Sequence, residues 1–172
     1  MRFKILTLLS LLLLFSGCKK NVKNKDAESI EQNNSQGISE KDIEDLDYIE
    51  YALDKKTDTI IQDWSEYIQI HDLVNNVKVG DLSFFNDNEK AIKLLLKELK
   101  TKIPEAIKSA SIEARLLVVE TKLYKLESLS NLSTTSKEEL LGTIKEFLVA
   151  FSNLNLQMNK KVEFDTRVIE RP

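Results

Sequence analysis

The sequence predicts an all-α fold, an antiparallel bundle of three long helices in which the middle one is kinked or broken. Three observations support this prediction. Over most of the chain beyond residue 39, apolar residues recur at alternating three- and four-residue steps, the spacing of one helical face. Residues 39–79 contain neither Gly nor Pro. Three of the periodic stretches begin with a Ser or Asn that has an acidic residue three positions later, which is a helix-start signal.

The first helix is expected from about residue 39 to residue 76. Ser39 with Asp42 resembles a capping box in which Asp takes the place of the usual Glu or Gln. One helical face then carries a seam of apolar and aromatic residues, namely Leu46, Leu53, Ile60, Trp64, Tyr67 and Val74.

A connection is expected between residues 75 and 88, because the apolar residues there lose helical spacing. Gly80 with Asp81 signals a turn. We expect Phe84 and Phe85 to close one end of the bundle.

The middle helix is interrupted by Pro104. Asn86 with Glu89 predicts a helix start, and this helix reaches about Lys102. Two apolar stripes continue beyond Pro104 to about residue 126: Ile107, Ala110, Ala114, Leu117 and Tyr124, and Ile112, Leu116, Val119, Leu123 and Leu126. At 1.5 Å per residue the stretch before Pro104 is only about 24 Å long, whereas a rod across it is about 64 Å and matches the first helix at about 57 Å. Length therefore favours three long helices over the alternative, a four-helix bundle.

The last helix is expected to follow a loop rich in Ser, Thr and Asn at residues 128–135. Ser136 with Glu139 is a full capping box. The apolar face then consists of Leu140, Ile144, Phe147, Phe151, Leu154, Met158 and Val162. We expect this helix to fade toward Arg171.

The N-terminus has the three parts of an export signal. Two basic residues within the first four are followed by an apolar run at residues 5–15 and then by the small residues Ser16 and Gly17. The run is about half of the roughly 20 residues that a membrane-spanning helix needs. Phe15-Ser16-Gly17-Cys18 resembles the lipobox of bacterial lipoproteins, although the position three before the cysteine is most often Leu.

The resemblance to bacterial lipoproteins implies cleavage before Cys18 and attachment of fatty-acyl chains such as palmitate to that residue. Two or more acyl chains give stable membrane anchoring. We therefore expect a signal peptide at residues 1–17, the lipidated Cys18 with a flexible polar tether at 18–38, and a helical bundle domain at 39–172. The expected location is the bacterial cell envelope, with the bundle facing the periplasm or the cell surface.

Charge and residue content argue against several functional classes. Removal of residues 1–17 leaves 23 basic and 28 acidic residues, an acidic balance that argues against nucleic acid as a partner. His71 is the sole histidine and Cys18 the sole cysteine, so the sequence predicts no catalytic residues, no metal site and no cofactor. The acidic residues at 42–47 are interpreted as stabilising a helix start rather than as a calcium site.

Two binding hypotheses remain. In the first, the chain is a non-catalytic envelope lipoprotein whose bundle binds a protein or an envelope polymer. Lys90, Lys93, Lys97 and Lys100, called here the lysine row, lie on one face of the second periodic stretch and form a candidate electrostatic binding face. In the second, the bundle holds a small ligand or a lipid in a pocket lined by Trp64, Tyr67, Phe147 and Phe151. A ligand binder should show a cavity of a few hundred Å³.

Overall fold

The computed structural model describes residues 37–167, and within them the predicted all-α bundle is confirmed. The elements are α2 (Glu40–Glu44), α3 (Lys55–Ile61), α4 (Ser65–Lys78), the short 3₁₀ helix η2 (Ser83–Phe85), α5 (Glu89–Thr101), α6 (Ala110–Ser130) and α7 (Lys137–Thr166). The predicted signal peptide, Cys18 and all but the last two residues of the predicted tether lie outside the described residues.

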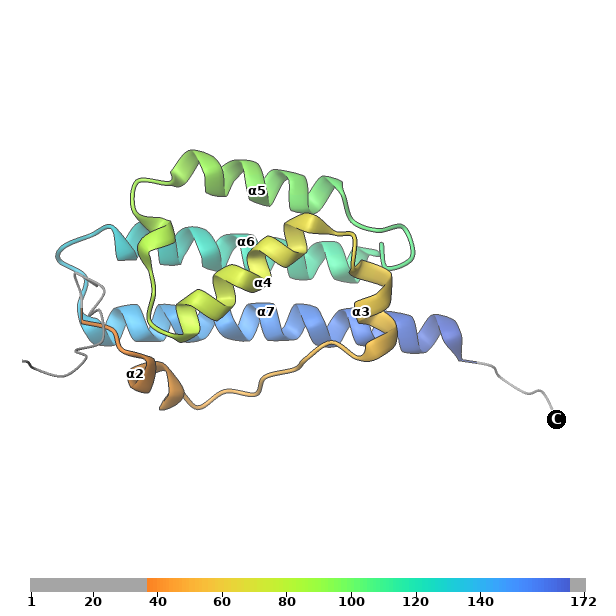
Figure 1. Ribbon diagram of the computed structural model, residues 1–172, viewed down its shortest axis with the longest axis horizontal. Helices are drawn as coiled ribbons and strands as arrows, with labels where there is room; N and C mark the ends of the chain where they lie inside the picture. The colour runs from red at the N-terminus through yellow and green to blue at the C-terminus, as the bar shows by residue number, and fades with distance from the viewer. Residues whose placement is uncertain (1–36, 168–172) are drawn as a thin grey trace, which may run out of the picture. The chain divides into compact units, whose positions relative to one another are not determined.

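Three helices lie side by side and alternate in direction, in the order α5, α6, α7 (Figure 1). The contact between α6 and α7 is the most extensive in the bundle. α4 crosses this layer obliquely, and α3 packs against α7 (Figure 1). The long helix α7 is therefore the element against which several others are placed.

The core lies where these helices meet. Its members include residues without any exposed surface from α4 to α7, namely Val77, Leu96, Leu116, Leu123, Phe147 and Met158. Burying one such side chain contributes about 1.5–3 kcal/mol. Ile38, at the end of the predicted tether, is also buried in this core, with 5% of its surface exposed.

The prediction of a single helix from residue 39 to residue 76 is wrong. α2 ends at Glu44, residues 46–54 run extended, and α3 and α4 are separate helices. Five of the nine residues in the extended segment, two Asp, two Tyr and one Ile, have a lower helix propensity than Ala, Leu or Glu. Its main-chain groups instead find partners on α7, so the segment loses little by leaving the helical conformation.

The break at Pro104 is confirmed, but the continuous rod that the length comparison favoured is not formed. α5 ends at Thr101, and α6 begins only at Ala110, where the Ser109 side chain accepts the N–H of Ile112. Ile107, expected within a helix, is buried in the connection. Because α5 and α6 run in opposite directions, their lengths do not add.

The other helix starts were predicted with mixed success. Ser136 caps α7 by accepting the N–H of Glu139, as expected. The start expected at Asn86 is wrong, because the residue preceding α5 is Asn88 and its side chain makes no capping bond. Asp87, with φ of +51°, turns the chain just before it.

The two phenylalanines of the connection behave as expected. Phe85 has no exposed surface, Phe84 is half-buried, and their rings meet edge to face at 6.0 Å. The Asn131 side chain donates to the Phe85 carbonyl oxygen at 2.8 Å, which ties η2 to the end of α6. These contacts place η2 and its two phenylalanines at the end of the bundle where α6 ends.

The capping box of α2 should make the free energy of unfolding depend on pH in the acid range. The Asp42 carboxylate accepts from Lys137 at 2.8 Å and from the Ser39 hydroxyl and N–H at 2.6 and 2.9 Å, and these contacts lower the pKa of Asp42 from 3.8 to about 2. Because the pKa is lowered, this stabilisation is fully present above pH 3.8 and is lost as the pH falls through about 2.

We expect an NMR titration of the carboxyl groups to place the Asp42 midpoint near 2, and Lys137→Met to move it toward 3.8, since the Lys137 hydrogen bond is the largest cause. An unchanged midpoint in the variant would contradict the contact between α2 and α7.

Candidate functional site

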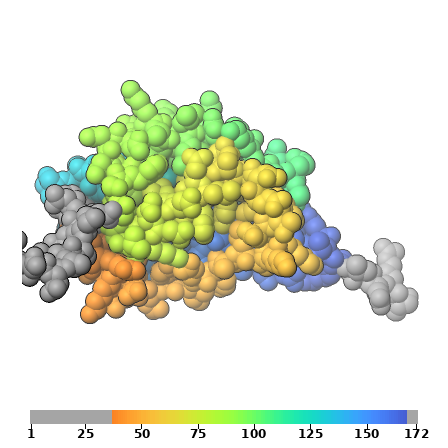
Figure 2. Space-filling model, in the orientation of Figure 1, coloured from red at the N-terminus to blue at the C-terminus, as the bar shows by residue number. Residues whose placement is uncertain are grey.

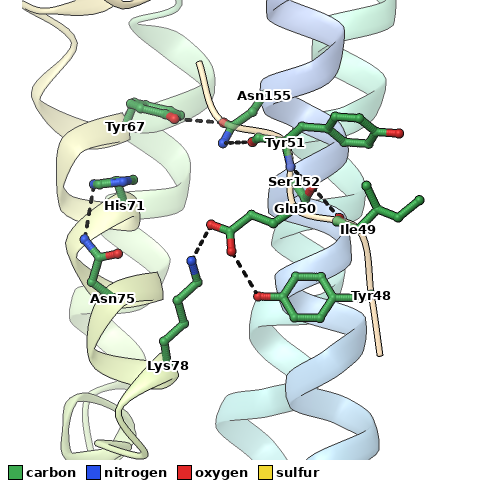
Figure 3. A network of polar contacts seen from close by, with 10 residues as sticks. All are labelled: Tyr48, Ile49, Glu50, Tyr51, Tyr67, His71, Asn75, Lys78, Ser152 and Asn155. Atoms are coloured by element: carbon green, nitrogen blue, oxygen red, sulfur yellow. Dashed lines mark hydrogen bonds and ion pairs between the residues drawn. The ribbon is translucent and has the colours of Figure 1, made fainter. Parts of the chain in front are cut away.

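The extended segment at residues 46–54, called here the strap, lies along α7 (Figure 3). None of its side chains is fully buried. Leu46, Tyr48, Tyr51 and Leu53 are half-buried, whereas Ile49 exposes 69% of its surface. Leu46, Tyr48 and Leu53 pack against the core, so partial burial of side chains contributes to holding the strap in place.

Three polar side chains of α7, Ser152, Asn155 and Asn159, hold the strap and are called here the polar ladder. Ser152 Oγ accepts the Tyr51 N–H at 2.8 Å and donates to the Ile49 carbonyl oxygen at 2.9 Å. Asn155 Nδ2 donates to the Tyr51 carbonyl oxygen at 3.0 Å (Figure 3).

Asn159 completes the ladder at the far end of the strap. Its Nδ2 donates to the Ala52 carbonyl oxygen at 2.9 Å, and its Oδ1 accepts the Asp54 N–H at 3.0 Å. The spacing of three and four residues places all three ladder side chains on one face of α7. All five hydrogen bonds go to main-chain atoms of the strap.

The ladder is itself anchored in the core by Tyr67 of α4. The Tyr67 hydroxyl donates to Asn155 Oδ1 at 2.8 Å, and the two residues expose only 4% and 6% of their surface. Burial, and to a lesser extent the nearby charge of Asp58, raises the pKa of Tyr67 well above its usual range. The phenol therefore stays a neutral donor, and Asn155 is held with both ends of its amide engaged.

Aromatic rings surround this anchor. Tyr67 stacks against Trp64 at 5.6 Å, against Phe151 at 5.5 Å and against His71 at 6.4 Å between ring centroids. Aromatic pairs at these separations contribute about 0.5–1.5 kcal/mol beyond the area they bury. The cluster fixes the ring of Tyr67 and hence the position of its hydroxyl.

A pocket of about 410 Å³ lies between the strap and α4. It is lined by Tyr67 and Phe151, two of the four aromatics predicted to line a ligand pocket. The other two do not line it: Trp64 and Phe147 pack in the core, with 2% and 0% exposed. Both occupy seam positions that face neighbouring helices, and this packing removes them from the pocket.

One wall of the pocket is charged. Lys78 of α4 forms an ion pair with Glu50 of the strap, and the Tyr48 hydroxyl lies 3.5 Å from the same carboxylate (Figure 3). Burial first, and Glu50 second, raise the pKa of Tyr48 to about 12. In Figure 2 the strap (orange) and α4 (yellow to green) together cover much of α7 on this face.

The lysine row is divided by the structure. Lys90, Lys93 and Lys97 are exposed on α5. Lys100 is half-buried, and its Nζ lies 2.6 and 2.7 Å from the two Glu120 carboxylate oxygens of α6. The exposed positive face thus comprises three lysines, while the fourth joins two helices.

His71 is half exposed on α4, with its Nδ1 3.4 Å from Asn75 Nδ2 (Figure 3). In the part of the chain from 37 to 167, no group of three or more His, Cys, Asp and Glu side chains is arranged to hold a metal ion. None of the helices in that same range is both long and apolar enough to cross a membrane.

Comparisons with protein-family models, with curated proteins and with solved structures found no match. Function is therefore inferred from the N-terminal sequence and from the strap, the polar ladder and the pocket. The polar ladder was not predicted from the sequence. The signal that could have revealed it is the set of polar residues at 152, 155 and 159 on a mostly apolar helical face.

Proposed function

We propose that the chain is a non-catalytic lipoprotein of the bacterial envelope, anchored to a membrane by lipid on Cys18, whose helical bundle binds another protein or an envelope polymer. The observation that carries the proposal is the position of the sole cysteine, directly after Ser16-Gly17 and an apolar run of export-signal length. A lipid on that sulfur gives the bundle a fixed place at a membrane surface.

Mass spectrometry of the N-terminus tests the anchor. We expect the mature chain to begin at Cys18 and to carry diacylglycerol on its sulfur and an acyl chain on its amino group. Cys18→Ala should abolish incorporation of labelled palmitate and leave the precursor uncleaved, whereas Ser29→Ala, within the predicted tether, should change neither. An unmodified thiol or a retained Met1 in the unaltered chain would overturn the proposal.

Proximity labelling and cross-linking in the native cell test the partner class, protein or polymer. A matched pair of triple variants tests whether the lysine row belongs to the binding face. We expect Lys90, Lys93 and Lys97 changed together to Gln to reduce the cross-linked partner at least about fivefold, because complementary charge steers association. Lys41, Lys55 and Lys56, also exposed, serve as the control triple. Equal yields from the two triples would remove the lysine row from the binding face.

A second function, binding of a small ligand, is favoured by the pocket of about 410 Å³ between the strap and α4. That volume falls in the range of ligand sites, about 300–1,000 Å³. We expect the dye anilinonaphthalene sulfonate to bind saturably, one per chain. Ala52 lines the pocket, so Ala52→Trp should weaken that binding about tenfold, and Ala106→Trp at an exposed site elsewhere should not. Equal binding by both variants would rule out the pocket.

A further inference from the structure

We propose that the polar ladder of α7 is a docking site for an extended segment of another protein chain, which takes the place of the strap. This inference rests on the proposed binding function and names its site and the kind of partner it accepts. The strap itself is an extended chain seated on the site, and its hydrogen bonds to Ser152 and Asn155 (Figure 3) and to Asn159 are the contacts that a partner segment would take over.

Recognition at the ladder is directed at the main chain. Ser152, Asn155 and Asn159 contact N–H and C=O groups that every residue except proline supplies. Strand addition to a sheet edge works in the same way, with main-chain bonds giving affinity and alternate side chains giving specificity. A ladder of this kind accepts many sequences that can lie extended.

The side chains of the strap indicate what a partner segment needs. Tyr51 and Leu53 are half-buried at alternate positions, while Ile49, Glu50 and Ala52 are exposed. Successive side chains of an extended chain point to opposite sides. The fitting partner is therefore an extended segment with bulky apolar residues two positions apart and no proline at the two N–H groups that the ladder accepts.

The strap is the least buried part of this site, with Leu46, Tyr48 and Leu53 packed only partly against the core. It contributes no fully buried side chain, whereas α7 beneath it carries residues such as Leu148 and Phe151 with 2% and 4% exposed. Segments with few buried apolar contacts open at lower free energy than core helices. Because the strap is covalently attached, its effective concentration at the ladder is about millimolar or higher. A partner segment must bind tightly enough to displace the strap at that concentration.

Peptide complementation in the full chain tests the site. We would replace residues 46–53 with a Gly/Ser sequence of the same length that has Pro at position 51, so that the replacement cannot donate to Ser152, and add a synthetic peptide of residues 44–56. The native peptide is expected to bind saturably and to raise the melting temperature as its concentration rises. A peptide with Ser at both exposed positions, Ile49 and Ala52, should bind within about threefold, since its main chain is unchanged.

The decisive peptide carries an N-methyl group at Tyr51, which removes the N–H that Ser152 accepts. We expect it to bind at least about tenfold more weakly, because one hydrogen bond is lost and one buried acceptor is left unpaired. A methyl group on the amide of Ile49, whose N–H makes none of the ladder bonds, is the matched control. Equal affinity of the two methylated peptides would overturn the proposal.

Hydrogen exchange in the unaltered chain gives a second test if the replaced chain does not fold. The Tyr51 and Asp54 amides, which donate to the ladder, should exchange at least about 30-fold faster than the Phe151 amide after correction for intrinsic rates. Equal protection would mean that the strap opens only on global unfolding, and the site would then be closed to a partner.

The outcome also separates this inference from the proposed function. If the peptide and exchange tests fail while the lipidated chain still cross-links a partner, the docking site lies elsewhere and the anchored binding function stands. If the peptides bind as expected but Cys18 carries no lipid, the site is supported and the membrane anchor is refuted.

Discussion

Replacement of Asn155 with alanine is expected to lower the free energy of unfolding by about 2–4 kcal/mol. Asn155 accepts from the Tyr67 hydroxyl at 2.8 Å and donates to the Tyr51 carbonyl oxygen at 3.0 Å. The lost bond to the strap costs about 1 kcal/mol, and leaving the buried phenol without a partner costs about 1–3 kcal/mol. Denaturation by urea, followed by circular dichroism, measures the change.

Two further variants give this prediction its control. Asn153→Ala alters the same residue type on the same helix at a half-exposed position that makes none of the strap contacts, and should cost less than about 1 kcal/mol. A double-mutant cycle of Asn155→Ala with Tyr67→Phe should show a coupling of about 1 kcal/mol, because the two changes remove one shared bond. Equal losses for the two asparagine variants would contradict the role of Asn155 in the ladder.

The parts of the fold that the sequence predicts are those decided by near neighbours. Ser39 with Asp42, and Ser136 at the start of α7, cap their helices as expected because a cap depends on residues within one turn. The apolar face of α7 is predicted for a similar reason, since a period of 3.6 over 30 residues has no competing interpretation.

The strap could not be predicted, because its apolar residues fit two patterns. Leu46 and Leu53 are seven residues apart and suit a helical seam, but Leu46 with Tyr48, and Tyr51 with Leu53, also alternate as in an extended chain. The choice is made by hydrogen bonds from α7 about one hundred positions away in the sequence. Such tertiary contacts override local propensity.

Only two of the four aromatic residues predicted to line a pocket do so, for a related reason. The seam of aromatics indicated which residues face the interior, but not whether each meets another helix or an open space. Tyr67 and Phe151 line the pocket because the strap passes beside them, while Phe147, one turn away from Phe151, packs fully in the core. A pocket whose wall is the strap cannot be predicted before the strap itself.

Replacement of Gly80 with alanine is expected to lower the free energy of unfolding by about 2–3 kcal/mol. Gly80 has a φ of +82° at the C-terminal end of α4, where its N–H donates to the Val77 carbonyl oxygen and the Asp81 N–H donates to that of Asn76. A Cβ atom there would lie 2.9 Å from the Ile38 carbonyl oxygen. The main chain of that segment would have to move, since no flexible side chain is available to yield.

Gly142 provides a control with the opposite expected sign. It lies inside α7, and a Cβ atom added there meets nothing within 4 Å, so Gly142→Ala should raise the free energy of unfolding by about 0.5–1 kcal/mol through helix propensity alone. Thermal unfolding of the two variants measures both changes in one experiment. A neutral or stabilising effect of Gly80→Ala would contradict the close approach of residue 38 to the end of α4, and with it the path by which the chain reaches α2 and the strap.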